Sequence, residues 1–298
     1  MARLRDRAMP RRDVLLLPVL LASSAALDAC GRAVASPSAE GSAGEEAPIE
    51  LHVSCAASLD APLAEVVAGF QESHPGADVQ VNADSSGTLA AQIEEGFSCD
   101  VFLSAAERQM DQLERDGFVV AGTRRDILAN RLVVVARADS ATHVTGIESL
   151  GAAASLALAA PLVPAGAYTR EALVRAGILP AGRDVASYTS AEVSAALGGV
   201  EVSEQSNVTK VLATVAEGSC EVGTVYASDL VGHEGELVAV AKVPSELTGP
   251  ITYPACLIQD DEADGRTREA AQEFLDFVCS DEAQALFERH GLTSAVTG

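Results

Sequence analysis

The chain has 298 residues, 48% of them hydrophobic, and a formal net charge of -23 at pH 7. This length and apolar content allow a large buried core in one domain or in two. The negative charge, with no basic patch after residue 30, argues against binding to nucleic acid or to anionic lipid.

Residues 1–30 have the features of an export signal. Five arginines stand at its start, an apolar run covers 14–27, and a lipobox-like Leu-Asp-Ala-Cys sequence ends it at Cys30. The apolar run is too short to cross a bilayer. We therefore expect a signal peptide over 1–30, lipidation of Cys30, and a flexible tether over 31–48, which is rich in Ser, Ala, Gly, Glu and Pro. The Arg11-Arg12 pair leaves Sec and twin-arginine export both open.

Five further cysteines follow, none of them in a C-x-x-C pair: Cys55, Cys99, Cys220, Cys256 and Cys279. This spacing argues against a zinc site. In an oxidising compartment up to two disulfides can form among them, and free buried thiols are the alternative. The sequence does not decide between these two arrangements.

Strands and helices alternate through the rest of the chain. The expected strands are, in order, 49–57, 77–81, 100–104, 132–137, 156–160, 223–226 and 254–258. Helices are expected between them, the first one capped by Asp60, and again over 270–290. This alternation predicts an α/β fold with mostly parallel sheets, whose ligands lie at the carboxyl ends of the strands.

Four of the expected helices begin alike, near Ser58, Ser86, Ala165 and Val208. Small or hydroxyl residues precede each first turn, and no Lys or Arg does. The backbone N–H groups of a first helical turn lack partners within the helix, and the positive end of the helix dipole faces outward with them. If these four helix starts face one cleft, they can hold an oxyanion with neutral donors. Ordinary N-capped surface helices are the alternative.

Five short segments stand out along the chain. They are, in order, Ala56-Ala57-Ser58-Leu59, Ser85-Ser86-Gly87-Thr88-Leu89-Ala90, Asp100-Val101-Phe102-Leu103-Ser104-Ala105, Val163-Pro164-Ala165-Gly166-Ala167-Tyr168 and Val225-Tyr226-Ala227-Ser228-Asp229. Together, in this order, they resemble the molybdate-binding component of molybdate ABC transporters. The resemblance runs from about Ile49 to Leu292. It implies a two-lobed type II periplasmic-binding-protein fold, with a mostly parallel, helix-flanked sheet in each lobe. Such a protein closes on molybdate or tungstate and delivers it to an ABC permease.

The resemblance also implies the ligand set. In this family two serines of the first lobe, with a small-residue amide, a valine amide and a tyrosine hydroxyl of the second, hold the oxyanion. By motif these are Ser58, Ser86, Ala165, Val208 and Tyr226. They contact the oxygen atoms of molybdate and do not ligate the metal directly. Val193 is the alternative to Val208, because the segment between Ala165 and Val208 is longer than the family pattern.

Asp84 stands beside the two serines, where the family has a neutral residue. A carboxylate there would repel a dianion unless it pointed to solvent. We expect lobe I to comprise 49–133 and 255–298, and lobe II to comprise 134–254. We further expect a monomer without a cofactor, exported to the periplasm or held by its lipid at the outer face of the cytoplasmic membrane.

Two other functions compete with this prediction. The first is binding of another tetrahedral oxyanion, such as sulfate or phosphate, since neutral helix-terminus sites suit any of them. The second is a hydrolase with Ser58 or Ser86 as its nucleophile, which would need a general base in reach. The sequence has no G-x-S-x-G motif and no His near either serine, so we expect no enzyme.

Overall fold

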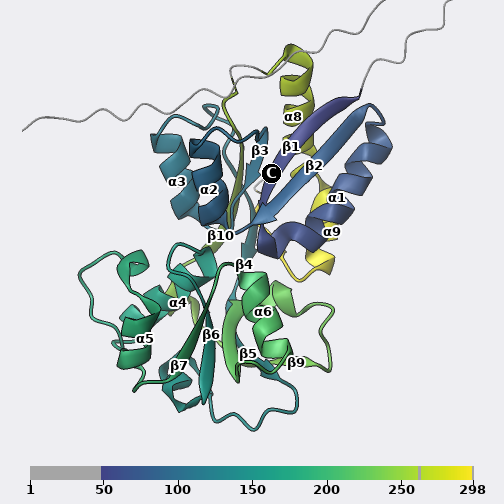
Figure 1. Ribbon diagram of the computed structural model, residues 1–298. Coiled ribbons are helices and arrows are strands. Elements are labelled where there is room, and N and C mark those ends of the chain that lie inside the picture. Colours follow the sequence, from purple (N-terminus) through teal and green to yellow (C-terminus); the bar gives the residue numbers. More distant parts are fainter. Residues whose placement is uncertain (1–47, 261–262, 297–298) are drawn as a thin grey trace, which may run out of the picture. The chain divides into compact units, whose positions relative to one another are not determined.

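The computed structural model describes residues 48–260 and 263–296, whose strands form two sheets (Figure 1). The strands of the first sheet are β1 (Ile49–Ala56), β2 (Ala77–Asp84), β3 (Val101–Leu103), β4 (Arg125–Asn130), β10 (Ile251–Leu257) and β11 (Thr293–Ser294). Those of the second are β5 (Leu132–Arg137), β6 (Ser155–Ala159), β7 (Glu201–Gln205), β8 (Val222–Tyr226) and β9 (Leu237–Lys242). The predicted signal peptide, Cys30 and the tether up to residue 47 lie outside the described residues.

Both sheets are mixed, whereas the sequence predicted mostly parallel ones. The first has the order β11-β4-β10-β3-β1-β2, with β1 parallel to β2 and β3, and with β10 antiparallel to β3 and β4. The second has the order β7-β6-β8-β5-β9, with β6 parallel to β7 and β8, and with β5 antiparallel to β8 and β9. The prediction missed β4 and β9, which run against β10 and β5. Antiparallel neighbours need no helical crossover, so helix–strand alternation does not reveal them.

The chain passes between the sheets at two places. Only Arg131 separates the end of β4 from the start of β5, and β10 returns the chain to the first sheet. The predicted lobe limits, at 133/134 and 254/255, fall within β5 and β10. The lobe limits themselves stay a prediction.

Helices cover both faces of the first sheet (Figure 1). One face packs against α1 (Asp60–Ser73), α8 (Gly265–Val278) and α9 (Asp281–Arg289), and the other against α2 (Ser86–Glu94) and α3 (Glu107–Arg115). The face under α2 and α3 has its own hydrophobic cluster, which includes Leu89, Ile93, Phe102, Met110 and Cys256. This cluster fixes α2 on the sheet, and with α2 it fixes the position of Ser86.

The second sheet is flanked by α4 (Pro164–Arg175), α5 (Ser190–Ala196) and α6 (Val208–Ala216), and the short α7 (Ser245–Thr248) packs on α4. Four 3-10 turns complete the described elements, at Ala57–Leu59, Ile147–Ala152, Val185–Ser187 and Ala227–Leu230. Asp60 is the first residue of α1 and not its cap, because the turn at Ala57–Leu59 leads directly into that helix.

The five cysteines of the described residues are free thiols, all buried except for the half-buried Cys279. They pack as small hydrophobic side chains. Burial raises the pKa of the Cys99 thiol to about 12, which keeps it protonated at neutral pH. Within 48–260 and 263–296, no helix is both long enough and apolar enough to span a membrane.

Candidate functional site

The five residues that the sequence predicted as ligand-binding all line one small cavity. Its lining also includes Ala56, Ala57, Ser85, Ala105, Val163 and Pro164, so it is built from elements of both sheets. Val193, the alternative to Val208, is buried on α5 and does not line it. The cavity is nearly closed, with a volume of about 10 Å³, which is the space of roughly one water molecule.

Ser86 is the first residue of α2 and is fully buried. Ser85 caps this helix, since its hydroxyl accepts a hydrogen bond from the Thr88 amide at 3.1 Å. The Ser86 hydroxyl oxygen accepts a hydrogen bond from the Ala105 amide at 2.9 Å. A hydroxyl carries one proton and two lone pairs, so the Ser86 proton remains available for a ligand in the cavity.

Ser58 lies in the turn after β1, and its hydroxyl oxygen is 3.1 Å from that of Tyr253 on β10. Asn130, the last residue of β4, donates from Nδ2 to the Tyr253 hydroxyl at 3.1 Å and to the Ser228 hydroxyl at 2.8 Å. Because the Tyr253 hydroxyl oxygen accepts a hydrogen bond from Asn130, its own proton is free to be donated to the Ser58 hydroxyl oxygen. The Ser58 proton can then point into the cavity.

Tyr253 and Asn130 are site residues that sequence reasoning missed. They do not belong to the quoted motifs, and they reach Ser58 only because β10 and β4 are neighbours in the first sheet. The one available signal was that Tyr253 directly precedes the strand expected over 254–258. No spacing in the sequence connects it to Ser58.

The hydroxyl of Tyr226, at the end of β8, is buried and has no hydrogen-bond partner among the described residues. The Tyr253 ring lies 5.7 Å away in an edge contact, but the two hydroxyls do not meet hydrogen-bond geometry. Burial first, and the neighbouring Tyr253 second, raise the pKa of Tyr226 well above its usual range, so it remains a proton donor. A buried unpaired hydroxyl is destabilising, and an acceptor in the cavity would relieve this.

Two backbone amides complete the set of donors. Helix α4 begins with Pro164, which has no N–H, so Ala165 carries its first free amide. Helix α6 begins with Val208, and its cap Asn207 accepts from the Lys210 amide at 2.9 Å, which leaves the Val208 amide unused. Within the described part of the chain, neither the Ala165 nor the Val208 amide has an acceptor.

Two glycines permit the close approaches around the cavity. A Cβ on Gly166 would lie 2.3 Å from the Ala160 carbonyl oxygen, so only glycine lets the start of α4 pack on the end of β6. A Cβ on Gly87 would lie 2.6 Å from the Leu162 carbonyl oxygen. Gly87 is on α2 and Leu162 precedes α4, so this second contact joins elements of the two sheets.

No charged side chain lines the cavity. Arg170 lies behind it, fully buried, where it donates to the carbonyls of Ala159 and Gly166, both at 2.9 Å. Burial lowers the pKa of Arg170 to about 10, so it still carries its charge at neutral pH. The Asp84 carboxylate does not line the cavity either, because it accepts from the Ser85 amide at 2.7 Å and from Asn207 Nδ2 at 3.4 Å.

Neither serine is hydrogen-bonded to a general base. The hydrogen-bond partners of Ser58 and Ser86 are a tyrosine hydroxyl and a backbone amide, and the lining of the ligand cavity contains no His, Asp or Glu. Among the described residues, no group of three or more His, Cys, Asp or Glu side chains could hold a metal ion. The arrangement is that of a binding site built from neutral hydrogen-bond donors.

Residues 51–293 match the family described as bacterial extracellular solute-binding protein. The molybdate-binding protein ModA of Escherichia coli (strain K12) is 31% identical over 254 residues, which cover 82% of this chain and 89% of that protein. YvgL of Bacillus subtilis (strain 168), a candidate ABC transporter substrate-binding lipoprotein, is 30% identical over 257 residues, covering 86% and 90%.

Among solved structures, the periplasmic molybdate-binding protein of Azotobacter vinelandii superposes with a TM-score of 0.66 at 20% identity, covering 83% of this chain and 100% of that one. This likeness confirms the predicted two-lobed fold. The relatives named above are substrate-binding proteins, not enzymes. From the family match, the relatives and the fold together, the chain belongs to the bacterial extracellular solute-binding proteins that serve ABC transporters.

Proposed function

We propose that this protein captures molybdate or tungstate in the cavity between its two sheets and delivers it to an ABC permease. The ligand set is Ser58, Ser86, Ala165, Val208 and Tyr226, acting through three hydroxyls and two backbone amides on the oxygen atoms of the ligand. Binding requires no cofactor, and no protein atom bonds directly to the metal atom of the ligand.

The observation that carries the proposal is the hydroxyl of Tyr226. It is buried, it lines the cavity, and it has no partner among the described residues. The other four groups around it are also hydrogen-bond donors, and no carboxylate lines the cavity beside them. A cavity that offers only donors suits a ligand that consists of acceptors, which is the chemistry of a tetrahedral oxyanion.

Neutral donors fit a transported ion because it must be released again. A buried ion pair between the ligand and a Lys or Arg would add a large desolvation term and a strong Coulomb attraction. Helix termini balance the charge with dipoles. The buried Arg170 guanidinium, held by carbonyls behind α4, contributes positive potential without contacting the ligand.

Sulfate and phosphate are tetrahedral oxyanions as well, and neutral donors suit them too. Molybdate and tungstate are favoured here by the relatives of this chain that are named molybdate-binding proteins. Isothermal titration calorimetry of the purified protein with molybdate, tungstate, sulfate and phosphate tests this. We expect tight binding of the first two and weak binding of the others, and selectivity for sulfate or phosphate would refute the proposal.

We also propose that Cys30 carries a lipid that holds the protein at the outer face of the membrane, and that the protein works as a monomer. YvgL, which covers most of this chain, is named as a candidate lipoprotein, which supports the anchor. A lipid on an otherwise acidic chain would keep it near the permease without any basic membrane-binding surface.

A further inference from the structure

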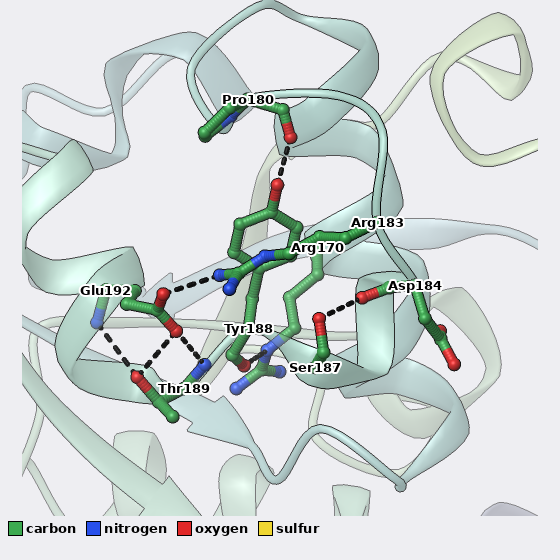
Figure 2. A network of polar contacts seen from close by, with 8 residues as sticks. All are labelled: Arg170, Pro180, Arg183, Asp184, Ser187, Tyr188, Thr189 and Glu192. Carbon is green, nitrogen blue, oxygen red and sulfur yellow. Dashed lines mark hydrogen bonds and ion pairs between the residues drawn. The ribbon is translucent and has the colours of Figure 1, made fainter.

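The segment between α4 and α5 is fastened to the second sheet from within (Figure 2). The buried Arg170 donates from Nε to the Tyr188 carbonyl at 2.8 Å, in addition to its bonds to Ala159 and Gly166. The Tyr188 ring is itself buried, and its hydroxyl donates to the Pro180 carbonyl. Pro180 and Tyr188, near the two ends of the segment, are therefore linked to each other and, through Arg170, to α4, the helix that begins at the cavity.

Further contacts fix the outer side of the same segment. The Arg183 guanidinium lies 3.7 Å from the centre of the Tyr188 ring and pairs with Glu192 at 2.6 Å. Thr189 caps α5, and Glu192 reaches back to the Thr189 amide at 2.9 Å. These contacts hold the segment firmly against the elements that flank the second sheet, so it is not a free loop.

Asp184 is the member of this segment that faces the other sheet. Its carboxylate accepts from the Ala186 amide at 3.0 Å, and its backbone carbonyl accepts from the Ser187 hydroxyl at 2.6 Å, so its conformation is set. Figure 2 shows its carboxylate pointing away from Tyr188 and Glu192. There it receives two parallel hydrogen bonds from Arg108 of α3, at 2.6 and 2.7 Å.

This pair connects the two sheets. Arg108 is on α3, which packs on β10 of the first sheet, whereas Asp184 belongs to the segment tied to α4 on the second. Of the ion pairs formed within the described residues, it alone joins the two sides. Beside it, Gln109 Nε2 donates to the Leu162 carbonyl at 3.2 Å across the same boundary, and the next residue, Val163, lines the cavity.

We propose that Arg108 and Asp184 form a clasp that holds the two lobes together around the ligand cavity and slows release of the bound oxyanion. The inference rests on the proposed function. Each partner is held in place by its own lobe, so opening the cavity requires breaking both hydrogen bonds. The clasp forms after the lobes have met, and it therefore acts on the dissociation rate and not on the encounter rate.

The size of the effect follows from exposure. The two side chains are 43% and 52% exposed, and an exposed pair changes an equilibrium by only about two- to fivefold. The two-pronged geometry favours the upper end of this range. The contact between Gln109 and Leu162 persists without the clasp, so loss of the ion pair weakens closure without abolishing it.

The test is the variant Asp184→Asn. Asparagine keeps the oxygen that accepts from the Ala186 amide, so the turn is preserved while the charge is lost. The matched control is Glu171→Gln, which removes the ion pair of Glu171 with Arg175 at 2.6 Å within α4, on the same side of the molecule. Stopped-flow measurement with molybdate should show release about two- to fivefold faster in Asp184→Asn, an unchanged association rate, and wild-type rates in the control.

A charge exchange makes the test specific. The double variant Arg108→Asp with Asp184→Arg should release molybdate more slowly than Arg108→Asp alone, because it restores the attraction across the boundary. If Asp184→Asn releases molybdate at the same rate as Glu171→Gln, the clasp does not exist.

The clasp and the proposed function can fail separately. If the wild-type protein binds none of the four oxyanions, the proposed function is wrong. Hydrogen–deuterium exchange of the ligand-free protein then tests the clasp, at the cavity amides of residues 160–166. Faster exchange in Asp184→Asn than in Glu171→Gln would support the clasp, and equal exchange in the two variants would overturn it.

Discussion

A single buried hydroxyl, that of Tyr226, distinguishes this cavity from an ordinary gap between packed helices. In Tyr226→Phe the ligand loses one donor, and a hydrogen bond to a charged group is worth about 1.5 to 3 kcal/mol, which lowers affinity roughly tenfold to hundredfold. The ligand-free protein should melt at or above the wild-type temperature, because the lost hydroxyl is buried without a partner among the described residues and is therefore destabilising. Calorimetry and thermal unfolding measure the two quantities.

The control for Tyr226→Phe is Lys210→Gln, which removes an exposed cation in the first turn of α6. The Lys210 ammonium bonds the Ser206 hydroxyl at 2.7 Å and does not line the cavity. We expect unchanged affinity for molybdate. A large loss in Lys210→Gln combined with normal binding in Tyr226→Phe would mean that cations, not neutral donors, hold the ligand. Arg170→Gln is unsuitable as a control, since it unpairs three buried carbonyls.

Asp229 gives the protein a pH dependence near neutrality. Part of the residue reaches the surface, but its carboxyl group is desolvated. This desolvation raises the pKa of Asp229 from 3.8 to about 7, although the hydrogen bond from the Tyr226 amide acts in the opposite direction. Between about pH 4 and 7 the folded protein therefore holds a proton that the unfolded chain has released, and stability falls as pH rises through this window. In Asp229→Asn this part of the decline should vanish. Urea unfolding at pH 5 and pH 8 measures it, and an equal decline in both proteins would contradict the assignment.

At the scale of elements, local signals in the sequence predicted the helix starts well. Helix α6 begins at Val208, where a helix start was expected, and Val208 lines the cavity while Val193 does not. All five residues predicted from the motifs line the same cavity, because each stands at the carboxyl end of a strand or at a helix start. These positions depend mainly on the local chain.

Features that depend on pairing between distant strands were not predictable. β7 is Glu-Val-Ser-Glu-Gln, an edge strand without an apolar run, and only its parallel pairing with β6 makes it a strand. In the same way Tyr253 supports Ser58 through sheet neighbours, and Asp84 finds Asn207 across the boundary between the sheets. The sequence alone did not show where the Asp84 carboxylate points. In the structure it accepts hydrogen bonds from Ser85 and Asn207 and does not line the cavity.

A substitution at Gly87 on α2 tests whether binding requires the close approach of α2 to Leu162 at the cavity. In Gly87→Ala the new methyl group would meet the Leu162 carbonyl oxygen at 2.6 Å, so closure must be strained and affinity for molybdate should fall. Calorimetry with molybdate measures this loss, and thermal unfolding of the ligand-free variant measures what the same clash costs the fold.

The control for this variant is Gly265→Ala at the start of α8, where an added Cβ meets no atom within 4 Å. Its affinity for molybdate should be unchanged. If Gly87→Ala also binds normally, the approach of α2 to Leu162 is not part of the closed state.

At the scale of the whole molecule, the proposed lipid on Cys30 determines where the protein works. Cys30→Ala should release the protein from the membrane fraction without altering its affinity for molybdate, because the residues that line the cavity all lie between Ala56 and Tyr226. Fractionation of cells that express each form measures this. A variant that stays with the membrane after signal processing would show that Cys30 is not the anchor.

The central claim is that neutral donors from both sheets hold one tetrahedral oxyanion. A crystal structure with molybdate, in which anomalous scattering locates the molybdenum atom, tests it most directly. We predict one strong peak in the cavity, with the ligand oxygens within hydrogen-bond distance of the Ser58, Ser86 and Tyr226 hydroxyls and of the Ala165 and Val208 amides. A peak elsewhere, or one whose oxygens are bonded mainly by Lys or Arg side chains, would contradict the account.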